Sequence, residues 1–202
     1  MNQLEFLNTE FLGNSVKSYL IFGSVLLLGL IFKSLISSYL RRLIYKIVGD
    51  KTNVDGKNEF DDLLKKPLNY FLLIIILYFA FDALSFPSSW GLAGSEEFGI
   101  KMVIEKGVSF LFITTIFWTL LRVIDYIGLR LKHKAEKTES KVDDQLIPFA
   151  IEIGKVLVVI FGLLIILGNV FDVDVTALAA GLGVGGVAVA LASKESLENL
   201  LG

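Results

Sequence analysis

The chain has 202 residues, of which 54% are hydrophobic, and its mean hydropathy is +0.68. A soluble chain of this length would form one or two domains, but the apolar runs here are too long and too numerous for that. The net charge of −2 gives no global field for nucleic acid, and the absence of cysteine excludes a disulfide framework, a thiolate nucleophile and a cysteine metal site.

Residues 1–17 precede the first long apolar run. Leu4, Leu7, Phe11 and Leu12 recur at helical spacing, which predicts a short helix lying in the outer interface of the membrane. An ordinary frayed terminus explains the same residues equally well.

Five segments have the length and the lack of charge expected of membrane-spanning helices. They run over residues 18–40, 68–84, 108–127, 147–170 and 175–193. The predicted fold is therefore an all-α membrane protein with five transmembrane helices. Its parts are an outer interfacial segment 1–17, a first transmembrane hairpin 18–86, an outer loop 87–107, a second transmembrane hairpin 108–170, and the last helix with the start of its amphipathic continuation, 171–202.

Basic residues are concentrated in two of the connecting loops. Arg41, Arg42 and Lys46 follow the first span, and Arg130 and Lys132 are among those that follow the third. Because basic loops stay in the cytoplasm, the N-terminus is predicted outside and the C-terminus inside the cytoplasmic (inner) membrane. Arg41, Arg42 and Lys46 would then hold anionic lipid headgroups of the inner leaflet. A role in setting topology alone fits them equally.

A short element occurs twice, once before the second span and once before the fourth. Asp61 and Asp62 in the first copy match Asp143 and Asp144 in the second. The chain thus consists of two similar hairpins followed by one distinct helix. Paired acids before an apolar run favour capping of a helix N-terminus. A catalytic or metal-binding pair is the less favoured interpretation, since no histidine is nearby.

Charges inside the spans are few. Lys33, Glu152 and Lys155 lie toward the cytoplasmic ends and are expected to extend to the interface. No predicted span has an acid at its centre, which argues against proton-coupled transport.

Two patterns suggest chemistry that the rest of the sequence does not support. Gly181, Gly183 and Gly186 satisfy GxGxxG, but the match lies inside an uncharged, membrane-length stretch without the surrounding strand and helix of a dinucleotide site. His133 is the only histidine and lies in a lysine-rich loop, where it is expected to be solvated. No metal-ligand set and no nucleophile with a base are present, so we predict no enzyme activity, no cofactor and no metal.

The last helix is built from glycine and alanine rather than leucine and isoleucine. With about 100° of rotation per residue, small residues form two flanks: Ala177, Gly181, Gly185, Ala188 and Ala192 on one side, and Ala179, Gly183, Gly186 and Ala190 on the other. A narrow face between the flanks carries Ala180, Val184, Val187 and Leu191.

Small residues let helix backbones approach closely, so two such flanks predict a close neighbour on each side. A head-to-tail contact that repeats and closes makes a ring, with the narrow face pointing toward the axis or directly away from it. A helix buried in a single-chain bundle is the alternative.

The segment 177–202 resembles the pore helix of the small-conductance mechanosensitive channel (MscS) family. The features that carry the resemblance are the run ALAAGLGVGGVAVALA, the polar step KES and the following LENLLG. The element VDDQLIPF also looks like the usual entry to the family's second core span. The resemblance covers the last three spans, and the first two look like an extra hairpin that some members carry.

The resemblance implies a homo-heptamer whose last helices line one pore. It places the gate at Val187 and Leu191, and so turns the narrow face, with the pore-lining Ala180 and Val184, toward the axis. It implies sliding helix–helix contacts along small residues, for which the two flanks and the family together suggest Ala180, Gly181, Gly183, Gly185, Gly186, Ala188 and Ala190.

Two departures from the family pattern matter. Glu195 stands where the family often has a glycine at a kink, so a hinge here would have to come from Ser193, Lys194 and Glu195 or from tertiary contacts. Members also usually continue into a cytoplasmic vestibule, whereas this sequence ends at Gly202. We expect it to be a piece of a longer chain.

The function implied is a mechanosensitive ion channel, opened by membrane tension, that releases ions and small osmolytes during hypo-osmotic shock. Its hydrophobic gate would close by dewetting, and the four earlier spans would form the tension-sensing paddle. The implied partners are membrane lipids and further copies of the chain. A secondary transporter built on the hairpin repeat and a non-conducting membrane scaffold are the alternatives.

Overall fold

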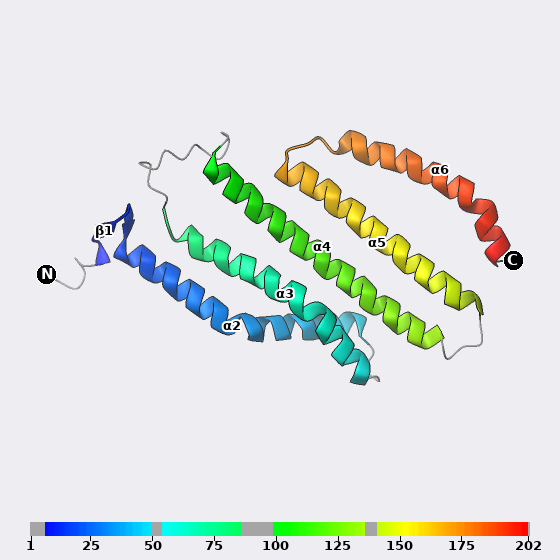
Figure 1. Cartoon of the computed structure of the whole chain (residues 1–202), viewed down its shortest axis with the longest axis horizontal. Coiled ribbons are helices and arrows are strands. Elements are labelled where there is room, and N and C mark those ends of the chain that lie inside the picture. Colours follow the sequence, from blue (N-terminus) through cyan, green and yellow to red (C-terminus); the bar gives the residue numbers. More distant parts are fainter. Residues whose placement is uncertain (1–6, 50–53, 86–98, 136–140, 202) are drawn as a thin grey trace. The chain divides into compact units, whose positions relative to one another are not determined.

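The structure is a computed structural model that describes residues 7–49, 54–85, 99–135 and 141–201. This described part consists of five long helices and a short β-hairpin (Figure 1), which confirms the predicted all-α fold. The elements are β1 (Glu10–Phe11), β2 (Asn14–Ser15), α2 (Val16–Val48), α3 (Val54–Asp82), α4 (Ile100–Ala135), α5 (Lys141–Val170) and α6 (Thr176–Leu201).

Each long helix contains a segment that is long and apolar enough to cross a membrane. These candidate spans are Val16–Val48, Gly56–Asp82, Lys101–Ala135, Leu146–Val170 and Thr176–Lys194. The chain is therefore a multi-pass membrane protein. Its helices extend beyond the predicted spans, and α4 already includes residues 100–107, which were predicted as loop. Most of the predicted outer loop, residues 86–98, lies outside the described part.

The chain divides into two compact units, Met1–Val123 and Ile124–Gly202, with the boundary inside α4. The first unit contains α2, α3 and the beginning of α4. The second contains the end of α4, α5 and α6. Each unit is described by itself below.

Residues 10–15 form a β-hairpin, so the predicted interfacial helix does not extend to Phe11 and Leu12. β1 and β2 pair antiparallel, with Phe11 opposite Asn14. Leu12 and Gly13 between them have positive φ angles of 50° and 76°. Two successive residues in this region make the tight turn that suits a two-residue hairpin, and they cannot continue a helix. Residues 1–6 lie outside the described part.

The hairpin is tied to the end of α3 by one side chain. The Asn14 amide donates to the Ser85 carbonyl (2.7 Å) and its oxygen accepts from the Ser85 backbone N–H (2.6 Å). Ser15 caps α2 by accepting a hydrogen bond from the Ser18 backbone N–H (3.2 Å). The entry to the first span is thus fixed by a helix cap and by a contact with Ser85, 71 residues further along the chain.

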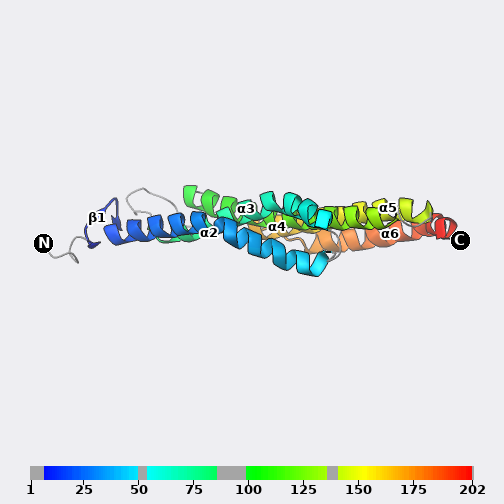
Figure 2. The ribbon, with the colours of Figure 1, turned by 90° about the horizontal axis from the view of Figure 1, so that it is seen from below.

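In the first unit, α2 and α3 pack antiparallel. Phe22 meets Phe81 edge-on near one end, and Tyr45 meets Phe60 near the other. Between them Gly29 faces Ile76 so closely that a Cβ on Gly29 would lie 2.5 Å from Ile76 Cγ2. Figures 1 and 2 both show α2 bending about halfway along its length.

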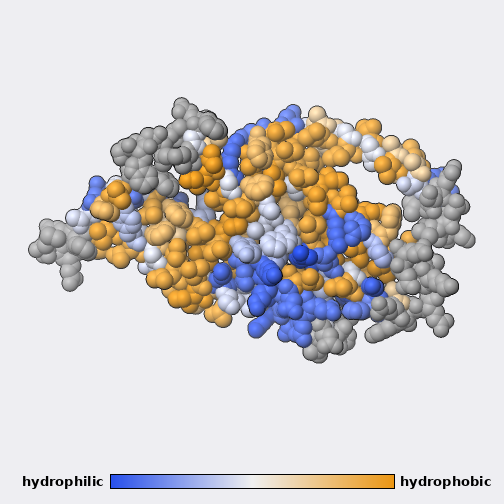
Figure 3. Space-filling model, viewed as in Figure 1, coloured by the Kyte–Doolittle hydropathy of each residue, from blue (hydrophilic) through white to orange (hydrophobic). Residues whose placement is uncertain are grey.

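Aromatic rings join α3 to the first part of α4. Tyr70 stacks on Trp118 with ring centroids 5.9 Å apart, and Phe71 lies 5.3 Å from Phe112. Elsewhere the spans present apolar side chains outward, as lipid-facing helices do, and Figure 3 shows this apolar surface over most of the helices. Hydrophilic side chains gather at the loop end of the α2–α3 hairpin.

The capping prediction is wrong for the first acidic pair. α3 begins at Val54, so Asp61 and Asp62 lie about two turns inside the helix. The polar stretch before the apolar run is itself helical, and Pro67 is buried within the same helix. Asp143 and Asp144, by contrast, are among the first four residues of α5, where capping stays a prediction.

We predict that Gly29→Ala destabilises the α2–α3 hairpin. The new methyl group would meet the stiff, β-branched Ile76 and force a shift costing about 1–3 kcal/mol. Equilibrium unfolding in mixed micelles measures this. Gly23→Ala on the same helix is the matched control, because a Cβ there meets nothing within 4 Å. Equal stabilities of the two variants would contradict the close contact, whereas recovery in Gly29→Ala with Ile76→Ala would support it.

Candidate pore helix and the charge pairs of the hairpins

α6 begins with a well-formed cap. Asp174 Oδ1 accepts a hydrogen bond from the Thr176 backbone N–H (2.9 Å). Hydrogen bonds from the Thr176 side chain and backbone hold the pKa of Asp174 below its ordinary value. Asp172 has a φ of 54°, and the Val173 N–H donates to the Leu167 carbonyl (3.0 Å). These contacts turn the chain sharply from α5 into α6.

Beyond this turn, the side chains of α6 are exposed. Every residue from 176 to 192 is exposed. A Cβ added at any of the four glycines would meet nothing within 4 Å, and these are Gly181, Gly183, Gly185 and Gly186. Within the described part of its own unit, α6 therefore does not use these four glycines for close packing.

The narrow face predicted between the flanks is also uncovered. The exposed fractions of Val184, Val187 and Leu191 are 74%, 60% and 69%. Val187 and Leu191 are four residues apart on a continuous helix, so their side chains lie one above the other, with Val184 and Ala180 in the same row. Their role as a gate stays a prediction.

The predicted hinge lies within an unbroken helix. α6 continues through Ser193, Lys194 and Glu195 to Leu201, and its ribbon curves toward its C-terminal end in Figure 1. Lys194 forms an i,i+4 ion pair with Glu198 (3.7 Å) across this region. Because both side chains are exposed, the pair supports the helix only weakly.

Arg41, predicted to hold lipid headgroups, is engaged within the chain. Its guanidinium donates to Asp61 Oδ1 (2.9 Å), Ser37 Oγ (2.6 Å) and Ser38 Oγ (2.9 Å), and its side chain is only 12% exposed. This geometry favours a structural role in joining α2 to α3. A serine pair one turn before an arginine was the signal in the sequence that could have indicated it.

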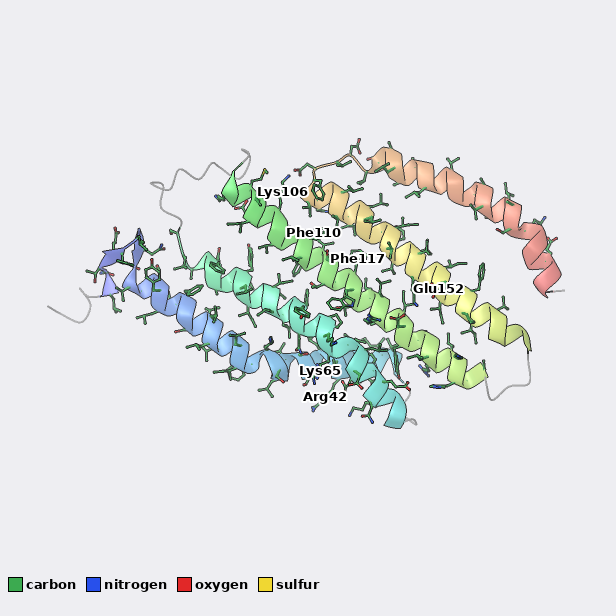
Figure 4. All side chains as sticks on the ribbon, viewed as in Figure 1. Arg42, Lys65, Lys106, Phe110, Phe117 and Glu152 are labelled. Carbon is green, nitrogen blue, oxygen red and sulfur yellow. The ribbon has the colours of Figure 1, made fainter. Side chains whose placement is uncertain are left out.

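Arg42 and Lys46 differ from Arg41 in their exposure. Both side chains are exposed and lie one turn apart on α2. Figure 4 shows Arg42 and Lys65 at the loop end of the α2–α3 hairpin. These two residues of α2 remain the predicted contacts for anionic headgroups.

The second hairpin contains a charge pair that the sequence analysis missed. Lys155 Nζ lies 2.8 Å from Asp125 Oδ1 on α4 and 3.1 Å from Glu152 Oε1 on its own helix. Lys155 was expected to extend to the interface, but instead it bonds across the hairpin. The sequence did contain a signal for this pair. An acid and a lysine lie on consecutive spans, at similar distances from the loop that joins the spans.

The comparisons with known proteins agree with the helix pattern. The chain is 30% identical over 199 residues to the small-conductance mechanosensitive channel MscMJ of Methanocaldococcus jannaschii, covering 96% of this chain and 53% of that protein. It is 29% identical to the large-conductance mechanosensitive channel MscMJLR of the same organism, covering 93% of this chain and 49% of that protein. It is 25% identical to the uncharacterized MscS family protein YhdY of Bacillus subtilis, over 89% and 45% of the two chains.

The chain belongs to the MscS family. It spans about half the length of the curated relatives that it matches. No family model and no solved structure matches it. The MscS-family assignment covers all five spans, including the first hairpin, and not only the last three that carry the resemblance in sequence motifs.

We predict that Asp174→Ala frays the first turn of α6, whereas Asp174→Asn preserves it. Because the pKa of Asp174 is lowered in the folded chain, its stabilisation is present above the ordinary carboxyl pKa and is lost as the pH falls through the lowered value. Hydrogen exchange of the amides at Thr176 to Leu178, compared at about pH 7 and about pH 3, measures this. Equal pH dependence in the parent and the Asn variant would contradict the cap.

Proposed function

We propose that this chain is the membrane part of a tension-gated channel, a pore and not an enzyme. The observation that carries the proposal is the exposure of α6. It is an apolar helix of membrane length, and its small-residue flanks are exposed in the described part of its unit. Membership of a family whose named members include mechanosensitive channels supports it.

The missing neighbours of α6 are further copies of the same helix. Because glycine and alanine have small side chains, the backbones of two such helices can approach closely. In lipid, this close packing stabilises the association of helices. Each helix has two such flanks, so one flank of a subunit would contact the opposite flank of the next. Repeated around an axis, this head-to-tail contact closes into a ring. We propose a heptamer, the subunit number that the family resemblance implies.

In the ring, the narrow face would line the pore. Ala180 and Val184 would form its wider part, and Val187 and Leu191 its apolar constriction. Water leaves such a constriction, and an ion cannot cross it because its hydration is lost there without replacement. When the constriction widens, ions and small osmolytes pass, as release during hypo-osmotic shock requires.

Membrane tension supplies the free energy for opening, because it favours the state with the larger area in the membrane plane. Helices α2 to α5 expose apolar side chains along their lengths and would be the surface on which lipid acts. In the proposed orientation the N-terminus lies outside the cytoplasmic membrane, and Arg42 and Lys46 face anionic headgroups of the inner leaflet.

We predict that Val187→Ser or Leu191→Ser lowers the opening threshold. A hydroxyl in the constriction keeps it wet, so the closed state loses its barrier to ions. Patch-clamp recording of the pressure threshold in membrane patches tests this. Val189→Ser is the matched control, since Val189 lies off the narrow face and is equally exposed in the protomer. Thresholds equal to the parent in the first two variants would count against the gate.

We also predict that Gly183→Leu and Gly186→Leu disrupt the ring without disrupting the protomer. A Cβ at either position would meet nothing within 4 Å, so we expect the loss to report contacts between subunits. Native mass spectrometry counts the subunits, and circular dichroism checks the helices. Gly107→Leu on α4, also in open space, is the control. Unchanged assembly and gating would refute the ring.

Substrate flux without tension would favour a transporter, and no current at maximal suction would favour a scaffold.

A further inference from the structure

The second hairpin contains an ion pair between its two helices, within a membrane-spanning stretch. Asp125 on α4 and Lys155 on α5 approach to 2.8 Å, and their side chains are 22% and 29% exposed. Both lie inside the candidate spans. Charges at this depth are costly unless they are paired, so the two residues have a physical reason to stay together.

The pair lies beside two close contacts between the helices. A Cβ on Gly128 of α4 would be 2.5 Å from Ile151 Cδ1 of α5, and a Cβ on Gly154 of α5 would be 3.9 Å from Ile124 Cδ1 of α4. Each helix thus contributes a glycine within about one turn of the ion pair. The contacts together define one antiparallel register for α4 and α5.

Only one register keeps the charges joined. Apolar contacts in lipid tolerate sliding, because acyl chains replace any contact that is lost. Sliding α5 by one turn along α4, about 5.4 Å, would separate Lys155 from Asp125 and break the ion pair that joins the two helices. Glu152, shown on α5 in Figure 4, moves with Lys155 and so cannot hold the two helices together.

We propose that Asp125 and Lys155 are positioning residues that lock α4 and α5 in a single register. The hairpin then tilts under tension as one body, and its whole displacement reaches the turn that leads into α6. The statement about tension rests on the proposed function, whereas the register lock does not.

The lock can be tested on the full-length protein in lipid nanodiscs by disulfide formation. The described sequence contains no cysteine, so Gly128→Cys with Ile151→Cys introduces one reporter pair at the close contact. Added to this pair, Asp125→Asn or Lys155→Met alone should slow cross-linking on the order of tenfold, the size expected for coupled charges in contact. The double change removes both charges that face each other across the hairpin and should restore a faster rate. Glu152→Gln is the matched control and should leave the rate unchanged.

Cross-linking as fast in the single variants as in the parent would overturn the lock, and so would a double variant as slow as either single one. If the single variants do not accumulate, accumulation of the double variant supports the ion pair, and failure of the double variant to accumulate overturns the ion pair.

For the rigid-body step, the oxidised and reduced reporter channels should open at the same pressure. A shifted threshold would overturn that step. A protein that never conducts would refute the proposed function, while the cross-linking rates would still decide the lock.

Discussion

Lipid gives the helices of this protein no general reason to associate, and that constraint explains where its contacts are found. Acyl chains solvate leucine and isoleucine as well as a neighbouring helix does, so pairs of helices depend on close backbone approach and on polar groups. Both hairpins show this arrangement. In each, a glycine of the first helix faces an isoleucine of the second, Gly29 against Ile76 and Gly128 against Ile151. In each hairpin an ion pair also joins the two helices.

The two ion pairs have opposite polarity. In the first hairpin the cation, Arg41, belongs to the first helix, and in the second hairpin the cation, Lys155, belongs to the second helix. They also lie at different places: Arg41 is near the loop end of α2, whereas Lys155 lies well inside α5. The hairpins are therefore similar in sequence pattern without being equivalent in how they are held. In both, an opposite charge on the neighbouring helix offsets the cost of a charge near or inside the membrane.

The last helix is different because it contains the residues for close packing but not the neighbours. The glycines and alanines of α6 leave its backbone accessible on both sides in the described part of its unit. Each hairpin has a close contact between its own two helices, whereas a Cβ at any of the four α6 glycines would meet nothing within 4 Å. This difference supports the proposal that α6 packs against further copies of itself.

Much of the fold followed from the sequence, because membrane length and lack of charge are properties of local segments. The five spans, the small-residue flanks of α6 and the row from Ala180 to Leu191 could all be found from spacing alone. The places where the prediction failed depend on contacts between segments far apart in the sequence. Residues 10–15 form a hairpin because Leu12 and Gly13 take up positive φ angles, and Asn14 ties this hairpin to Ser85. Arg41 turns inward because Asp61 and two serines accept its hydrogen bonds, and Lys155 is held because Asp125 faces it across the hairpin.

The sequence by itself determined which segments cross the membrane and which helix has faces made for close packing. Only the tertiary structure decided which charges meet, since hydropathy measures the affinity of each segment for lipid and says nothing about the register in which two segments pack.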